Sequence, residues 1–224
     1  MIRWTQLGAA QIPGGGELRL MQRGSEFSIV SGAIELMNSR LSGSEEALAV
    51  LSCERIRARP KPRVLIGGLG MGFTLRAALA ALPPSARIDL AELVPAVIGW
   101  ARGPMAHIFD GCLEDPRLVV HEADVADVIG RASRAAYDAI LLDIDNGPEG
   151  LDRQANDRTY AARGLADAQA ALRPGGVLAV WSAAPDSGFV LRLRKAGYAV
   201  EERRVRASAS GRGARHIIWL ATPA

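Results

Sequence analysis

The residues that could do chemistry in this sequence are a group of glycines and a few carboxylates, each placed after an apolar segment. Gly68, Gly70 and Gly72 follow the apolar run 64–67, which itself ends in Gly67. Glycine lets the backbone bend sharply and leaves no Cβ in a ligand's way, so such a turn binds through its N–H groups. A sharp strand-to-helix turn that binds nothing is the alternative.

Glu92 is a carboxylate with informative spacing. It ends the strand-like run 87–92 and lies about 20 residues after Gly72, where nucleotide-binding sheets place an acid that holds a ribose diol. A solvated charge at a strand end is the alternative. The joint spacing of glycines and acid favours the nucleotide-type ligand.

Asp143 and Asp145 form a second acidic position. Asp143 ends the apolar run 137–143, and Asp145 lies in the polar loop 144–150 that follows. Ligands of parallel sheets bind outside the carboxyl ends of the strands, which is where both residues fall. An acid that ends a buried strand needs a partner, which favours a functional Asp143. For Asp145 a turn formed by Asx residues is a serious alternative.

The elements that must position these residues alternate between strand and helix from residue 63 onward. This order predicts a parallel sheet with crossover helices. Strands are expected at 63–67, 87–92, 117–121, 137–143 and 177–181, helices at 73–82, 95–102, 125–134, 158–172 and 186–197, and a final antiparallel pair at 198–206 and 215–221.

The first 43 residues have a different pattern. Short alternating runs at 17–23, 26–31 and 33–37 are separated by glycines, which predicts a small antiparallel β appendage. Ser44 is expected to cap the helix that follows. We therefore divide the chain into an appendage at 1–43 and a ligand-binding domain at 44–224.

Composition limits the class of protein. Of the 224 residues 49% are hydrophobic and 23% charged, as in an ordinary soluble protein, and the net charge is +3. Neither a membrane-spanning run nor a leader peptide is indicated, so we expect a cytoplasmic protein without a membrane partner. The arginine cluster at 203–215 fits a solvated sheet edge better than a nucleic-acid site. The three histidines lack metal-ligand spacing, so no metal site is expected.

Together, these motifs resemble the class I S-adenosylmethionine-dependent methyltransferase fold, a Rossmann-like seven-stranded sheet that ends in an antiparallel hairpin. The likeness lies in the glycine turn, Glu92, the step Glu122-Ala-Asp124, Asp143 and the run Arg173-Pro-Gly-Gly-Val-Leu178. Within that superfamily the sequence is most similar to spermidine synthases. They share the N-terminal β appendage, the double glycine, a segment like Asp115-Pro-Arg117 and an acidic loop with Gly-Pro.

The resemblance implies roles for single residues. The turn 68–72 would contact the amino-acid or aminopropyl end of the cofactor, Glu92 the ribose hydroxyls and Asp124 the adenine amino group. For Asp124 a helix N-cap is an equally good interpretation. Asp143 would take the proton that an amine acceptor loses, with Asp145 as a stand-in. The family also implies a homodimer that pairs through the appendage.

The sequence departs from spermidine synthases at two places. Gly70 stands where they carry an Asp that faces the amine of decarboxylated S-adenosylmethionine. A backbone N–H accommodates a carboxylate instead, which favours the intact cofactor. The loop after the fourth strand is also shorter by two residues, since Gly147-Pro148 follows Asn146 directly.

Our hypothesis is a transferase that binds S-adenosylmethionine or its decarboxylated form and moves a methyl or aminopropyl group to a small nucleophile, expected to be an amine. A catalytically inactive cofactor-binding or interaction protein of the same fold is the alternative. A dinucleotide-dependent dehydrogenase is a weaker one, because the third, helix-packing glycine is missing at the usual spacing.

Overall fold

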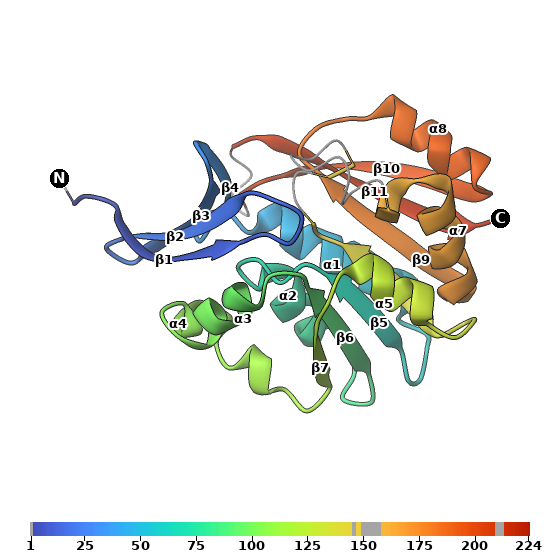
Figure 1. The fold of residues 1–224 in the computed structure, drawn as a ribbon. Coiled ribbons are helices and arrows are strands. Elements are labelled where there is room, and N and C mark those ends of the chain that lie inside the picture. Colours follow the sequence, from blue (N-terminus) through green and yellow to red (C-terminus); the bar gives the residue numbers. More distant parts are fainter. Residues whose placement is uncertain (1, 145–146, 149–157, 209–212) are drawn as a thin grey trace.

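The centre of the protein is a mixed β-sheet (Figure 1). The computed structural model describes residues 2–144, 147–148, 158–208 and 213–224, and in this part of the chain the sheet has seven strands in the order β10-β11-β9-β8-β5-β6-β7. The strands are β5 (Arg63–Gly67), β6 (Arg87–Glu92), β7 (Leu118–Glu122), β8 (Tyr137–Leu142), β9 (Leu172–Ser182), β10 (Tyr198–Arg206) and β11 (Arg215–Pro223). Strands β5 to β9 are parallel, whereas β11 pairs antiparallel with both β9 and β10. The predicted sheet with its terminal hairpin is confirmed.

Helices cover both faces of this sheet. One hydrophobic core contains the buried residues of α1 (Gly43–Ile56), α2 (Phe73–Ala81) and α3 (Pro95–Arg102). The other contains those of α5 (Val125–Arg131), α7 (Ala162–Ala171) and α8 (Ser187–Lys195). The short α4 (Ala106–Phe109) and η1 (Cys112–Glu114) connect α3 to β7. None of the helices in the described ranges has the length and apolar character needed to span a bilayer.

A second, antiparallel sheet is formed by the N-terminal residues. Its strands are β1 (Thr5–Gln11), β2 (Glu17–Arg23), β3 (Glu26–Ser31) and β4 (Ile34–Asn38), paired in that order. Phe27 and Ile29 are buried in the same core as α1, α2 and α3, and the ring of Phe27 lies 5.4 Å from that of His107. The N-terminal sheet therefore packs against the α3–α4 side of the molecule (Figure 1).

Three local predictions need correction. Strand β1 was not predicted, because Thr5–Gln11 lacks a clear apolar alternation and is ordered by pairing with β2. Ser44 does not cap α1: the N-cap residue is Ser42, which makes no side-chain cap hydrogen bond, and Ser44 is buried in the first turn. The helix predicted at 158–172 is interrupted at residue 161, between a helical turn at 158–160 and α7, and β9 begins at Leu172, five residues earlier than expected.

The register of the sheet gathers the ends of three strands at one edge. Gly67 pairs with Ala91 of β6 on one side and with Leu142 of β8 on the other. Glu92 and Asp143, the residues at and after these strand ends, therefore lie on either side of the glycine turn. A parallel sheet places all its carboxyl ends on one edge, so this convergence follows from the topology.

Candidate active site

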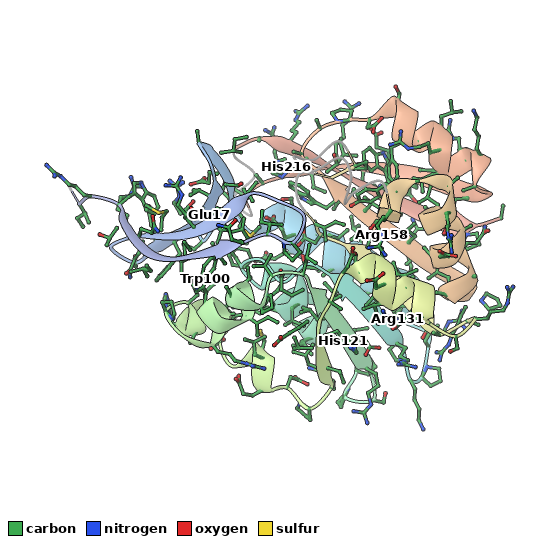
Figure 2. All side chains as sticks on the ribbon, in the orientation of Figure 1. Glu17, Trp100, His121, Arg131, Arg158 and His216 are labelled. Atoms are coloured by element: carbon green, nitrogen blue, oxygen red, sulfur yellow. The ribbon has the colours of Figure 1, made fainter. Side chains whose placement is uncertain are left out.

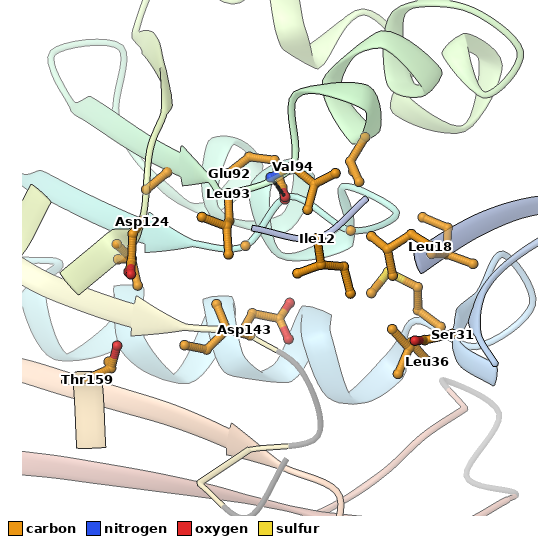
Figure 3. A pocket seen from close by; sticks show the side chains of 18 residues that line it. Ile12, Leu18, Ser31, Leu36, Glu92, Leu93, Val94, Asp124, Asp143 and Thr159 are labelled. Carbon is orange, nitrogen blue, oxygen red and sulfur yellow. Dashed lines mark hydrogen bonds between the residues drawn. The ribbon is translucent and has the colours of Figure 1, made fainter. Parts of the chain in front are cut away.

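A pocket lies at this edge of the sheet, between the strand ends and the N-terminal sheet (Figure 3). The described residues that line it come from the N-terminal sheet and its β1–β2 loop, the glycine turn, the ends of β6 and β8, α3, the start of α5 and the segment before α7: Ile12, Leu18, Ile29, Ser31, Leu36, Met37, Gly68, Gly70, Ala91, Glu92, Leu93, Val94, Val97, Asp124, Val125, Asp143, Ile144 and Thr159. Five of the residues predicted from the sequence are among them. The wall formed by the N-terminal sheet is almost entirely apolar.

Gly68 and Gly70 form the floor of the pocket, and both need glycine for reasons visible in the structure. Their φ angles are +92° and +50°, in the region that side chains disfavour. A Cβ on Gly68 would overlap the carbonyl oxygen of Asp143, and one on Gly70 would lie 2.9 Å from Sδ of Met37. The turn is therefore closed by packing on both sides and leaves only backbone toward the ligand.

Gly67 and Gly72 lie just outside the pocket lining. A Cβ on Gly67 would lie 2.8 Å from Cγ2 of Val125, and one on Gly72 would overlap the ring of Phe109. Gly72 is the N-cap residue of α2, with φ of +77°. These two glycines permit close packing of the turn, whereas Gly68 and Gly70 face the ligand space.

Glu92 is held rigidly at the end of β6. It is 7% exposed, and its two carboxylate oxygens accept hydrogen bonds from different backbone N–H groups. Oε2 accepts from Leu69 at 2.9 Å and Oε1 accepts from Val94 at 2.8 Å. These two backbone contacts fix the position and orientation of the carboxylate at the edge of the pocket. The contact with Leu69 also links Glu92 to the glycine turn.

Asp124 serves as the N-cap of α5. Its Oδ1 accepts from the backbone N–H of Ala126 at 2.8 Å, which is the helix-capping role that the sequence left open. Its Oδ2 accepts at 3.2 Å from Nη1 of Arg158, a residue labelled in Figure 2, and Arg158 also pairs with Asp127. The two carboxylate oxygens of Asp124 thus have separate partners. Oδ1 caps the helix, whereas Oδ2 can exchange Arg158 for another hydrogen-bond donor.

Asp143 follows β8 on the opposite side of the pocket from Glu92 (Figure 3). Its Oδ2 accepts from the hydroxyl of Thr74 at 2.5 Å, and its backbone N–H donates to the carbonyl of Gly67 at 2.9 Å. Burial raises the pKa of Asp143 to about 7, with a further contribution from the negative charge of Glu45 and an opposing one from Thr74. A carboxyl group with such a pKa can take up a proton at neutral pH.

Some site features were missed by the sequence analysis, and one prediction cannot be placed. Asp145 lies outside the described residues. Thr74, the hydrogen-bond partner of Asp143, sits in an apolar helix without a motif. Met37 and the other apolar residues of the N-terminal sheet belong to runs from which only an antiparallel appendage was predicted. The alternation of apolar and polar residues in these strands does not indicate that one face of the N-terminal sheet covers the glycine turn.

The fold and the edge site define a class of protein, the class I methyltransferase fold. A crystal structure of a spermidine synthase in complex with the transition-state analogue AdoDATO superimposes with a TM-score of 0.77, covering 98% of this chain and 74% of that one at 20% identity. The spermidine synthase of Thermotoga maritima gives 0.75 over 98% and 73% at 20% identity. Human methyltransferase-like protein 13, solved with SAH, gives 0.58 over 80% and 79% at 21% identity.

Sequence comparison identifies curated relatives. The polyamine aminopropyltransferase of Mycobacterium tuberculosis is 32% identical over 145 residues, which are 61% of this chain and 27% of the relative. Putrescine N-methyltransferase 4 of Nicotiana tabacum is 32% identical over 119 residues, 53% of this chain and 29% of the relative. The matches thus span less than a third of these two relatives. No family model matches the sequence. The chain thus has the class I methyltransferase fold, and part of its sequence is similar to polyamine aminopropyltransferases and putrescine N-methyltransferases.

Proposed function

We propose that the protein is a transferase that moves an alkyl group from an adenosyl sulfonium cofactor to a small amine. The relatives that support this are named aminopropyltransferase and N-methyltransferase, so alkyl transfer is common to both groups. The observation that carries the proposal is the placement of Glu92 and Asp143 on either side of a bare glycine turn. One acid is suited to holding a sugar, and the other to accepting a proton.

The described residues fit such a cofactor. Gly68 and Gly70 line the pocket with backbone alone, which suits the tail of the ligand. Glu92, held in place by its two backbone contacts, would accept hydrogen bonds from the ribose hydroxyls. Oδ2 of Asp124 would exchange Arg158 for the adenine amino group, while Oδ1 continues to cap α5.

The chain's own residues would supply positioning and a base. When bound, a sulfonium supplies an electrophilic carbon and a neutral leaving group. The pocket must then hold the acceptor nitrogen in line with that carbon. As the new N–C bond forms and the C–S bond breaks, Asp143 accepts the proton that the nitrogen releases. The pKa of Asp143, raised to about 7, makes it a stronger base than an ordinary carboxylate.

We infer that the transferred group is methyl, from intact S-adenosylmethionine. By the resemblance, Gly70 would face the cofactor's tail, and it offers a backbone N–H rather than a carboxylate, beside the thioether of Met37. A carboxylate end is compatible with this surface, whereas the ammonium of the decarboxylated form would lack a counter-charge there. Aminopropyl transfer is the second candidate, because the aminopropyltransferase relatives match a larger share of the chain.

We also propose that the N-terminal residues 1–43 form a distinct appendage through which two copies pair. Strands β1 and β4 are the edges of the N-terminal sheet, and Trp4, Leu7 and Ile34 expose 36%, 42% and 44% of their surface. Edge strands with exposed apolar residues favour pairing. Light scattering coupled to gel filtration would test this, and a monomer at all concentrations would contradict it.

Calorimetric titration with both forms of the cofactor tests the function. The proposal expects binding of S-adenosylmethionine and transfer of labelled methyl to a member of an amine panel. Tight binding of the decarboxylated form alone would replace it by aminopropyl transfer. Binding without turnover on any amine would favour an inactive cofactor-binding protein. If neither form binds, the transferase assignment is wrong.

A further inference from the structure

Behind Asp143 lies a network of polar side chains that the proposed reaction does not use. It is formed by Ser44 and Glu45 in the first turn of α1, Thr74 of α2 and His216 at the start of β11 (Figure 2). Ser44 and Thr74 are buried, at 0% and 2% exposure. A buried polar side chain is stable only where it has hydrogen-bond partners, and the members of this network supply partners to one another.

The distances join these residues into one chain of contacts. Oγ1 of Thr74 lies 2.5 Å from Oδ2 of Asp143 and 3.3 Å from the backbone oxygen of Glu45. Oγ of Ser44 lies 2.5 Å from Oε2 of Glu45 and 2.9 Å from Nδ1 of His216. The start of α1 is fixed in place because the N–H of Gly43 donates to Ala207 at 2.9 Å. Thr74 and Ser44 thus link Asp143 and His216 to two parts of the same residue, the backbone carbonyl and the carboxyl group of Glu45.

Both hydroxyl groups can serve either protonation state of the acids. When Asp143 is ionised, Thr74 donates to it; when Asp143 is protonated, it donates to Thr74, which then donates to the carbonyl of Glu45. The hydroxyl of Ser44 can likewise donate or accept between Glu45 and His216. It donates to an ionised Glu45 and accepts from His216, or accepts from a protonated Glu45 and donates to the ring nitrogen. The network therefore tolerates a proton on either carboxyl group.

The charges around the network favour such a proton. Burial is the main cause that raises the pKa of Glu45 and of Asp143, and the negative charge of Glu45 raises that of Asp143 further. Burial also lowers the pKa of His216, whose ring packs edge-on against Trp181 at 4.8 Å and is therefore neutral at pH 7. In the described ranges, the other titratable group on this turn of α1 is Glu46, and Arg76 of α2 is bonded elsewhere, to Ile108.

We propose that Glu45 is a positioning residue for Asp143: the two carboxyl groups share one proton, and Ser44 transmits the ionisation of the pair to His216. Two like charges in a buried site are not both ionised until the pH exceeds their ordinary range. The pair therefore titrates as a unit, with a last proton that is released near neutral pH. Thr74 keeps Asp143 directed at the pocket in either state.

The consequence for catalysis rests on the proposed function. When both carboxyl groups are ionised, the pair accepts the proton that the amine loses. One carboxyl group is then neutral, and the repulsion between the two negative charges is relieved. Without Glu45, Asp143 would be a weaker base that is ionised at lower pH. The acidic limb of the kcat/KM profile should then move downward, and the rate above neutral pH should fall.

The proton sharing itself is tested on the ligand-free protein by nuclear magnetic resonance. The chain has only three histidines, so the ring signals of His216 can be assigned with His107→Gln and His121→Gln variants. We expect the shifts of His216 to show an inflection near pH 7, where the pair loses its proton, besides the titration of the ring itself. Glu45→Gln should abolish this inflection, and Asp143→Asn should move it to lower pH.

Two further variants complete the test. Glu54→Gln removes the same charge from an exposed position on α1 and should leave the inflection unchanged. Ser44→Ala keeps both carboxyl groups but removes the hydroxyl that links Glu45 to His216, so the inflection should disappear from the His216 signals. This variant tests the proposal even if Glu45→Gln does not fold. An inflection that survives in both Glu45→Gln and Ser44→Ala, or that is absent from the parent, overturns the proposal. Neither result depends on cofactor binding, so a failed transferase assignment is recognised separately.

Kinetics give a second readout once a transferred group is detected. Glu45→Gln should lower the pH of the acidic limb by about one unit or more, while Glu54→Gln should not. An unchanged limb in Glu45→Gln would show that Asp143 acts without Glu45.

Discussion

The backbone of Gly68 lies directly against the carbonyl oxygen of Asp143. A Cβ on Gly68 would overlap that oxygen, and the neighbouring Gly67 accepts a hydrogen bond from the Asp143 N–H at 2.9 Å. The glycine turn and the candidate base are therefore parts of one rigid contact between β5 and β8. A ligand held by the turn is automatically placed beside Asp143.

This contact predicts the effect of Gly68→Ala. Besides the backbone strain of φ +92°, the methyl group would push against backbone atoms that cannot rotate away. We expect a loss of about 2–4 kcal/mol in the free energy of unfolding, measured by urea denaturation. Gly111→Ala is the control, because Gly111 also has positive φ, +74°, and a Cβ there meets no atom within 4 Å. Equal losses in the two variants would contradict the packing argument.

The raised pKa of Asp143 predicts a pH-dependent stability. Its folded-state pKa of about 7 lies above the ordinary value of 3.8, so the folded protein holds the proton more tightly than the unfolded chain. This stabilisation of the folded protein is complete below pH 4. It is lost as the pH rises through 7, so the free energy of unfolding falls by roughly 2–4 kcal/mol.

Asp143→Asn should remove this dependence and unfold at a higher temperature than the parent at pH 8, while losing alkyl transfer. Thermal unfolding at pH 5 and pH 8 measures the difference. The exposed Asp110→Asn, at a left-handed position where Asn is tolerated, provides the matched control. A parent protein that is equally stable at both pH values would show that Asp143 is ionised at both.

Glu92→Gln tests the ribose role and should have two effects. The amide NH₂ of Gln cannot accept from a backbone N–H, so either Leu69 or Val94 loses its acceptor, at a cost of about 1–3 kcal/mol of stability. The affinity for S-adenosylmethionine should fall by about tenfold or more, measured by calorimetry on protein that is still folded. Glu122→Gln, at the exposed end of the strand paired with β6, should change neither quantity.

Asp124 offers a way to separate helix capping from recognition of adenine. Asp124→Ala removes the cap of α5 and should cost about 1 kcal/mol of stability. Asp124→Asn retains the capping oxygen and should have nearly the parent's stability. It replaces the second oxygen by a donor and should therefore bind the adenosyl cofactor about tenfold more weakly. Unweakened binding in Asp124→Asn would leave capping as the whole role of this residue.

The sequence predicted much of the site because its signals are local. Helix α3 has the predicted bounds, and Glu92 and Asp143 lie where their runs of apolar residues place them. Asp124 shows the limit of this reasoning. The sequence allowed both a cap and a ligand contact, and the structure places its two oxygens in separate environments. Ser44 shows it more clearly, because a serine before two glutamates is a typical capping signal, yet its partner is His216.

The sequence by itself determined the parallel sheet, the glycine turn and the acids at the strand ends. Each of these follows from periodicity and spacing within one segment, and the topology of parallel strands brings their ends to one edge. Only the tertiary structure decided that Met37 lies against Gly70 and that Glu45 and Asp143 meet at the hydroxyl of Thr74. These contacts join segments far apart in the chain, and they depend on how α1 and the N-terminal sheet pack, which no local pattern specifies.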